Sequence, residues 1–189
     1  MNVGIVIAIL VVVVVIVLLA VVLGQRRRTG RLQEQFGPEY QRTVARAGDQ
    51  RAAEADLAAR EQRRQQLDIV ALEPAARDRY LEAWRVTQGR FVDDPAGATR
   101  EADKLVADVM RDRGYPVDDF EQRAADVSVD HPQVAENYRA AHAIHQANEQ
   151  GLASTDDLRQ AFVHYRSLFS QLLDVEGDGR KEAIDERAP

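Results

Sequence analysis

An unbroken apolar run from Val3 to Leu23 constrains this chain more than any other feature. The run consists of Val, Ile, Leu and Ala with a single glycine, and it contains no charged residue. As a helix it would be about 32 Å long, at about 1.5 Å per residue, and a bilayer core is about 30 Å thick. A single segment in hydrocarbon must satisfy its own backbone hydrogen bonds, which favours a helix. The sequence therefore predicts a transmembrane helix over residues 3–23.

A cleaved signal peptide is the alternative interpretation of this run. Signal peptides have a basic start, an apolar stretch of about 7–15 residues and a small-x-small cleavage site. No basic residue precedes this run, the run is longer than such a stretch, and Leu23-Gly24-Gln25 is a poor cleavage site. We therefore expect an uncleaved membrane anchor.

The arginines that directly follow the run predict its orientation. Arg26, Arg27, Arg28 and Arg31 lie just after it, and no Lys or Arg lies before it. Because basic residues flanking a membrane helix stay on the cytoplasmic side, we expect an extracellular N-terminus and a cytoplasmic C-terminal part at the cell membrane. The same arginines could contact anionic lipid headgroups, but the topology role is the simpler interpretation.

Charge and cysteine content exclude several functional classes. The chain has no cysteine, which excludes disulfides, thiol nucleophiles and cysteine metal sites. Residues 24–68 contain 10 arginines and 7 acidic residues, whereas residues 69–189 contain 15 basic and 24 acidic residues. Nucleic-acid binding requires a basic face, so the acidic distal part argues against a nucleic-acid partner. We expect the lipid bilayer and an unidentified protein as partners.

The rest of the chain has the spacing of helices and turns, without the alternation of strands. The predicted fold class is all-α, with an N-terminal transmembrane helix, a helical linker and a small C-terminal bundle of about four helices. The expected division of the chain is a transmembrane helix over 3–23, a basic helical linker over 24–71, a soluble bundle over 72–173 and a disordered acidic tail over 174–189.

Capping patterns and prolines mark the helix starts in the bundle. Asp94 before Pro95 predicts an N-cap, and Asp118 with Glu121 three residues later resembles a capping pair. Ser154-x-x-Asp157 is a capping box for the last helix. The first bundle helix is expected to turn one aromatic-rich face inward, made of Tyr80, Leu81, Trp84, Gln88 and Phe91.

Metal-binding candidates are weak. His142 and His145 are three residues apart, so they could share one face of a helix, but a metal site would need further ligands. In the tail, Asp174, Asp178 and Asp185 imitate part of a calcium loop, yet only four residues follow and no second helix can form. We therefore expect no metal and no cofactor.

Catalytic motifs are also absent from the sequence. It contains no G-x-S-x-G, no P-loop and no G-x-G-x-x-G, so we predict no catalytic residue and do not expect an enzyme. The favoured hypothesis is a protein-interaction or scaffolding module at the membrane. The alternative is a ligand- or metal-sensing domain, or an enzyme, built around His142, His145, Tyr138 and Tyr165.

Four segments of the distal part carry a resemblance to known proteins: Arg90–Gly97, residues 109–130, His131–Arg139 and Ser154–Gln160. In these segments the chain resembles a group of uncharacterised actinobacterial single-pass membrane-anchored proteins. The resemblance covers roughly residues 72 to 173. It implies a membrane-anchored helical unit, and it assigns no catalytic residue.

Overall fold

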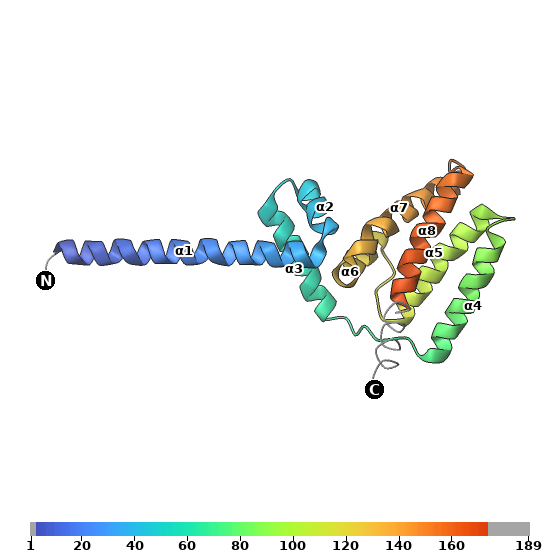
Figure 1. Ribbon diagram of the computed structural model, residues 1–189, viewed down its shortest axis with the longest axis horizontal. Coiled ribbons are helices and arrows are strands. Elements are labelled where there is room, and N and C mark those ends of the chain that lie inside the picture. The colour runs from blue at the N-terminus through green and yellow to red at the C-terminus, as the bar shows by residue number, and fades with distance from the viewer. Residues whose placement is uncertain (1–2, 174–189) are drawn as a thin grey trace, which may run out of the picture. The chain divides into compact units, whose positions relative to one another are not determined.

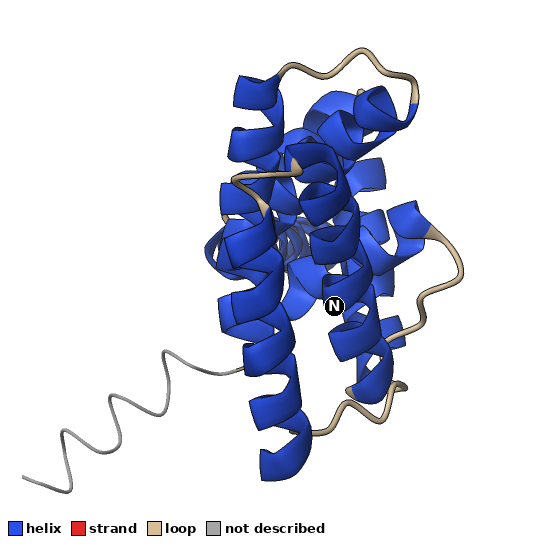
Figure 2. Ribbon diagram, turned by 90° about the vertical axis from the view of Figure 1, so that its right-hand side faces the viewer, coloured by secondary structure: helices blue, strands red, loops and turns tan. Residues whose placement is uncertain are grey.

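The structure of the protein is a computed structural model that describes residues 3–173, except for the side chains of residues 3–9, 11, 14, 17 and 21. Over the described range the chain folds into helices joined by short connections, and it contains no strand (Figure 1, Figure 2). The all-α class is thereby confirmed. The tail predicted over 174–189, with the metal candidates Asp174 and Asp178, lies outside the described residues.

The described part of the chain forms eight helices: α1 (Val3–Phe36), α2 (Pro38–Ala47), α3 (Gln50–Gln65), α4 (Pro74–Arg90), α5 (Pro95–Asp112), α6 (Phe120–Asp130), α7 (Pro132–Glu149) and α8 (Thr155–Leu172). Gly37 and Gly48 separate the first three helices with φ angles of 48° and 68°, in the left-handed region that glycine adopts at little cost. Four helices begin with a proline, which suits the first helical position because that position needs no N–H donor.

Contacts within the chain define two compact units, which divide α3 between Leu57 and Ala58. The first unit contains α1, α2 and the first part of α3. Its buried apolar core consists of Leu32, Phe36, Tyr40, Ala53 and Leu57. The predicted linker therefore has a small packed core of its own, because the chain turns at Gly37 and again at Gly48 and so folds three successive helices.

The apolar run forms the first two-thirds of α1, which continues without a break to Phe36. Among the residues with described side chains, no helix offers an apolar stretch long enough to cross a membrane. The transmembrane part of the predicted fold, residues 3–23, is thus not supported by these residues and stays a prediction.

The second unit contains a bundle formed by α4 to α8. Helix α8 packs against both α5 and α7, while α4 packs on α5 and α6 packs on α7 (Figure 1). Helix α5 buries a stripe of small and aliphatic residues at helical spacing: Ala98, Ala102, Leu105, Val106, Val109 and Met110. Helix α8 buries Leu158, Ala161, Phe162, Tyr165, Leu168, Phe169 and Leu172. These two stripes make up most of the bundle core.

Helix α4 contacts this core through a narrower face than the sequence predicted. The Trp84 ring stacks on Phe169 with centroids 4.6 Å apart and lies 5.0 Å from Phe162. In contrast, Leu81 is 36% exposed and Gln88 is also exposed, so the prediction that both turn inward is wrong. The reason is that α4 lies at the edge of the bundle, where α5 is its main helical neighbour.

Two of the predicted helix caps are confirmed. The Asp94 carboxylate accepts a hydrogen bond of 2.8 Å from the backbone N–H of Gly97. At the start of α8, the Asp157 backbone N–H donates to the Ser154 hydroxyl, and the Ser154 backbone N–H donates to the Asp157 carboxylate, which completes the capping box. Both patterns use only residues within one helical turn.

The cap of α6 differs from the prediction by one residue. Asp119, and not Asp118, caps this helix, and its carboxylate accepts a hydrogen bond of 2.7 Å from the Gln122 backbone N–H. The Asp119 backbone is extended, with φ −118° and ψ 131°, as an N-cap residue usually is. With two adjacent aspartates, the sequence pattern alone did not distinguish the two positions.

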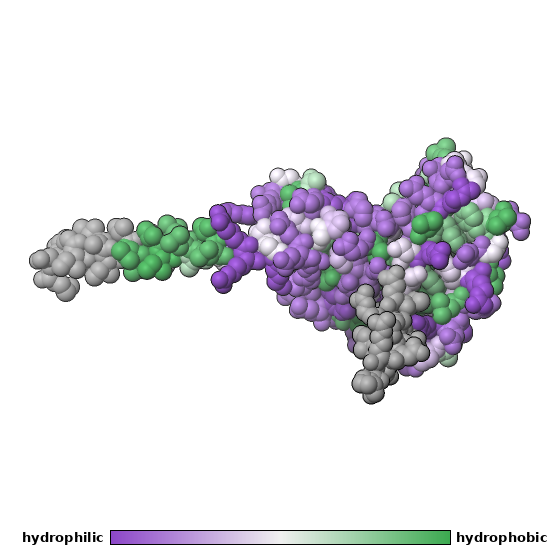
Figure 3. Space-filling model, viewed as in Figure 1, coloured by the Kyte–Doolittle hydropathy of each residue, from purple (hydrophilic) through white to green (hydrophobic). Residues whose placement is uncertain are grey.

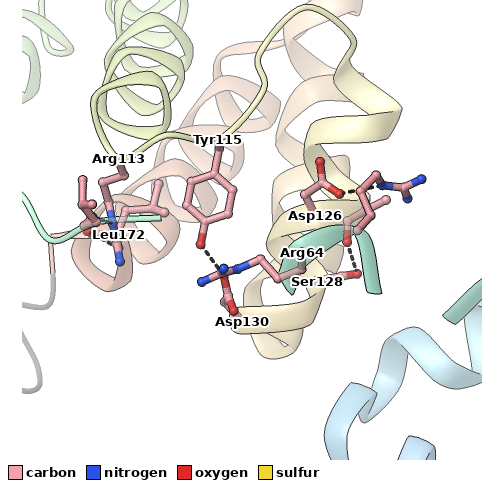
Figure 4. Close-up of polar contacts among 10 residues, drawn as sticks. Arg64, Arg113, Tyr115, Asp126, Ser128, Asp130 and Leu172 are labelled. Carbon is pink, nitrogen blue, oxygen red and sulfur yellow. Dashed lines mark hydrogen bonds and ion pairs between the residues drawn. The ribbon is translucent and has the colours of Figure 1, made fainter. Parts of the chain in front are cut away.

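Ion pairs attach the end of α3 to α6 inside the second unit (Figure 4). The Asp130 carboxylate accepts hydrogen bonds from the Arg64 guanidinium and from the Tyr115 hydroxyl. One turn earlier in α6, the buried Asp126 carboxylate lies 3.3 Å from Arg63 Nε. Charge-assisted hydrogen bonds of this kind are stronger than neutral ones, so they hold the α5–α6 connection and α3 together.

Arg113 ties the connection before α4 to the end of α8. Its guanidinium donates to the backbone carbonyl of Leu172 at 2.6 Å and to that of Val70 at 3.2 Å (Figure 4). The neighbouring Gly114 has a φ of 95°, and a Cβ at this position would lie 2.4 Å from the backbone oxygen of Asp68. Only glycine therefore fits this close approach.

Candidate functional site

The two predicted histidines lie on the same face of α7, as their spacing indicated. Their ring centroids are 5.8 Å apart and the rings are nearly parallel, at 23°. The structure places Tyr138 one turn before His142 on the same helix. Over the described residues, no three His, Cys, Asp or Glu side chains come close enough together to hold a metal ion. His142 and His145 are therefore better treated as part of a polar cluster.

An aspartate from α5 joins these side chains. The Tyr165 hydroxyl, on α8, donates a hydrogen bond of 2.9 Å to Asp103 Oδ1. His142 Nδ1 lies 3.9 Å from the same oxygen, a distance at which a protonated imidazole would form an ion pair. We call the group that forms around this carboxylate the Asp103 cluster: Asp103, Phe120, Arg123, Tyr138, His142, His145 and Tyr165. Its members come from α5, α6, α7 and α8.

Aromatic rings and one guanidinium line the α6 side of the cluster. Phe120 stacks on His142 with centroids 3.6 Å apart and an interplanar angle of 10°, and it lies 5.0 Å from Tyr138. The Arg123 guanidinium carbon is 5.7 Å from the Phe120 ring centroid and 5.9 Å from that of Tyr138. At these distances the cation is attracted to the ring faces, which compensates part of the cost of its burial.

Several buried polar atoms of the cluster have no hydrogen-bond partner among the described residues: Arg123 Nε, Tyr138 Oη, His142 Nδ1 and His145 Nδ1. Tyr138 is fully buried. An unsatisfied buried donor or acceptor costs about 1–3 kcal/mol, so native proteins contain few of them. Four in one place indicate a position where an additional polar group, from a ligand or a water molecule, would be stabilised.

Electrostatics keep Asp103 ionised. Burial alone raises the pKa of this carboxyl, but the neighbouring side chains of His142, Tyr165 and His145 outweigh burial and hold the pKa below its usual range. The phenol of Tyr165 shifts in the opposite direction. Burial and the neighbouring Asp103 carboxylate raise its pKa, so Tyr165 remains a hydrogen-bond donor.

Sequence reasoning named four members of the cluster and missed Asp103, Phe120 and Arg123. Asp103 did give a signal, because it lies four residues after Thr99 and three before Val106, and both of these residues are buried. A carboxylate on the inward stripe of a helix indicates a buried polar contact. No comparable signal existed for Arg123, since its partners depend on how α6 packs against α7.

A second candidate site lies in the first unit, beside the basic residues that follow the apolar run. Arg26, Arg27, Arg28 and Arg31 are all exposed. Next to them is an open hollow with a volume of about 500 Å³. It is lined by Gln25, Arg28, Thr29, Asp49, Gln50, Arg51, Glu54 and Ala55. The sequence did not indicate this hollow, since it forms only where α3 returns to α1.

No protein-family profile, no curated protein and no solved structure matches this chain significantly. The resemblance to actinobacterial membrane-anchored proteins therefore stays a prediction.

Asp103→Asn should destabilise the bundle in a pH-dependent way. Removing the charged acceptor of the Tyr165 hydroxyl should lower the free energy of unfolding by about 2 kcal/mol at neutral pH. Because the pKa of Asp103 is depressed in the folded chain, its stabilising contribution is present above the unfolded pKa of about 3.9 and is lost as the pH falls through the folded pKa. Urea unfolding of the full chain in mild detergent, followed by circular dichroism, measures this difference.

Glu101→Gln is the matched control, because it removes the same charge from the same helix. Glu101 is more exposed and has only a long contact of 4.0 Å with Lys104, so its substitution should leave stability close to wild type. A loss in Asp103→Asn that stays constant from about pH 6 to about pH 3 would contradict an ionised Asp103 in the folded state.

Proposed function

We propose that this chain is a single-pass membrane-anchored protein that presents its helical bundle to a partner protein at the cytoplasmic face of the membrane. The proposal combines three properties of the chain: an apolar helix, basic residues at its end, and a folded unit with an acidic composition.

The observation that carries the anchoring part is the exposure of apolar side chains on α1. Nine large ones have exposed fractions between 46% and 63%: Leu10, Val12, Val13, Val15, Ile16, Leu18, Leu19, Val22 and Leu23. At about 100° per residue they are distributed around the whole helix, with no polar face between them. Figure 3 displays this stretch as a continuous apolar surface followed by a hydrophilic band. An all-round apolar helix is stable only inside protein or lipid, and no residue that the structure describes covers it.

The exposed arginines support the cytoplasmic orientation. Arg26, Arg27 and Arg28 lie within one turn of α1, directly after Leu23. Basic residues that flank a membrane helix stay on the cytoplasmic side. The bundle follows these arginines in the chain and would therefore lie on the same side. The acidic distal part would be repelled by an anionic leaflet, which would keep the bundle surface accessible to a protein.

Exposed apolar residues on the bundle support the partner-binding part. Val86 on α4 and Val163 on α8 are 55% and 58% exposed, and Leu152 before α8 is 74% exposed. Single exposed aliphatic residues are common on protein surfaces, so these three positions indicate where a partner could bind but not how far its contact surface extends. Val163 lies next to Phe162, whose ring packs on Trp84, and is therefore held on a well-packed part of the bundle.

Arginine substitutions in the apolar run should abolish anchoring. In the double variant Val15→Arg/Leu19→Arg, each charge costs about 3 kcal/mol near the centre of a membrane helix, so insertion should fail. Wild type should remain in the membrane pellet after carbonate extraction, and the variant should move to the supernatant. The apolar exchange Val15→Leu/Leu19→Val is the matched control and should behave as wild type.

The same fractionation can include a reporter fused after Pro189 to determine orientation. A reporter that is active only in the cytoplasm should give a signal. Extraction of wild type by carbonate would refute the anchor, and activity solely from an export-dependent reporter would refute the orientation while leaving the anchor intact.

A photocrosslinking residue placed at Val163 should capture one recurrent protein in cells. The matched position is Glu121, which is exposed on α6, a helix that contacts α7. Mass spectrometry of the membrane fraction should identify the same adduct from Val163 in independent cultures and none from Glu121. Equal background adducts from both positions would contradict partner binding through α8.

A ligand-sensing domain is the second candidate function, and the unsatisfied atoms of the Asp103 cluster favour it. A small polar molecule that accepts from Arg123 Nε and contacts Tyr138 Oη would satisfy groups that the described residues leave unpaired. Phe120 and Tyr165 would hold these groups in position, since each is packed against another cluster member. In this function, binding of the ligand to the Asp103 cluster would change the stability of the bundle.

Tyr138→Phe tests this second function. A bound ligand stabilises only the folded state. The melting temperature of natively purified wild type should therefore be a few degrees higher than that of the same protein after unfolding, exhaustive dialysis and refolding, which remove the ligand. Tyr138→Phe should remove that difference, because it deletes a ligand contact. Tyr80→Phe is the control: Tyr80 donates to Asp112, outside the cluster, and the difference should persist. Identical melting of wild type before and after dialysis would indicate water in the cluster and refute the ligand.

A further inference from the structure

The hollow in the first unit forms where the start of α3 returns to α1 and brings side chains from both helices together. Thr29 of α1 donates a hydrogen bond of 2.7 Å to Glu54 of α3, which fixes the two helices at this point. Arg28 and Arg51 line the hollow from α1 and α3 respectively. Two guanidinium groups distant in sequence therefore face one open space of about 500 Å³.

The acidic side chains of the hollow are already occupied by protein donors. Glu54 Oε1 accepts hydrogen bonds from Thr29, from the Tyr40 hydroxyl at 3.0 Å and from Gln50 Nε2 at 2.9 Å. Asp49 accepts a hydrogen bond of 2.8 Å from the Ala52 backbone N–H at the start of α3. Both carboxylates thus have structural roles: Glu54 joins side chains of α1, α2 and α3, and Asp49 caps the start of α3.

The two arginines, in contrast, keep their donors available. The charge of Arg28 helps to lower the pKa of the Glu54 carboxyl, but among the described residues no ion pair or side-chain hydrogen bond occupies the guanidinium group of Arg28 or of Arg51. A guanidinium group presents five N–H donors in a planar fork that matches the oxygens of a phosphate. The unused binding capacity of the hollow is therefore for an anion with several oxygens.

The balance of charge selects the type of anion. The two arginines and the two carboxylates leave the lining without net charge, so every negative charge on a ligand adds to the repulsion by Asp49 and Glu54, and a singly charged anion is favoured over a doubly charged one. A phosphodiester carries a single negative charge and two free oxygens, one for each guanidinium. Free inorganic phosphate, which at neutral pH is a mixture of monoanion and dianion, suits the hollow less well than a phosphodiester, which is always a monoanion.

The position of the hollow along α1 indicates the source of such a group. Arg28 follows Leu23, the end of the apolar run, by five residues, which is about 7.5 Å along the helix axis. Each headgroup layer of a bilayer is roughly 5–7 Å thick outside the hydrocarbon core. We propose that this hollow binds the phosphodiester headgroup of a membrane lipid through Arg28 and Arg51, an inference that depends on the membrane anchoring proposed above.

A comparison of two arginine variants tests this site. The full chain is placed in maltoside micelles, which contain no phosphate, and titrated with short-chain phosphatidylglycerol while the arginine Nε–Hε signals are followed by NMR. Arg51→Gln should bind about fivefold more weakly, the value expected for one arginine–headgroup contact. Arg27→Gln should stay within about twofold of wild type, because Arg27 is exposed but does not line the hollow.

The two substitutions discriminate between a formed site and diffuse attraction. Arg27 is nearer to the apolar run than Arg51 in sequence, so attraction by unlocalised charge would make Arg27→Gln at least as harmful, and that outcome would overturn the proposal. Inorganic phosphate is the second arm: binding as tight as that of the lipid would overturn the lipid assignment. Failure of carbonate-resistant anchoring would refute the proposed function without altering the micelle titration, so the two failures are distinguishable.

Discussion

Burial of one face of α8 is the interaction on which the bundle depends. Helix α8 lies against both α5 and α7, so its apolar stripe supplies the core to two neighbours at once. Phe162 and Phe169 reach Trp84, which gives α4 its main aromatic contact with the bundle. Tyr165, on the same stripe, brings its hydroxyl to Asp103. The core and the polar cluster are therefore consequences of the same helix packing.

That packing has an energetic cost at its centre. Asp103 is held ionised in a largely buried position, and Tyr138 is fully buried with no described residue as a hydrogen-bond partner for its hydroxyl. An apolar replacement of the same shape would remove these penalties, as it often does for buried polar groups in other proteins. The buried polar side chains among α5, α6, α7 and α8 make this interior less stable than a fully apolar interior would be. Buried polar clusters of this kind are typical of binding sites.

Local signals predicted the helices and their ends well, and they failed where packing between helices decides. The Ser154–Asp157 box was predictable because both residues lie within one turn of α8. Leu81 was expected inside the bundle, but α4 lies at its edge and leaves this side chain exposed. Asp103 was missed because its role depends on Tyr165, which is 62 residues away in sequence. The histidine pair on α7 was predicted, whereas its surroundings required the tertiary structure.

Helix α1 has a mechanical consequence that follows from its continuity. It runs for 34 residues without a proline or a break, from the apolar run to the core residues Leu32 and Phe36. At about 1.5 Å per residue it is a rod of roughly 50 Å with no hinge inside it. Any tilt or axial rotation imposed on its apolar end must therefore turn Leu32 and Phe36 as well. Helix α1 would transmit such a movement to the core of the first unit as a rigid body. The first position at which the backbone can bend is Gly37, after the end of the helix.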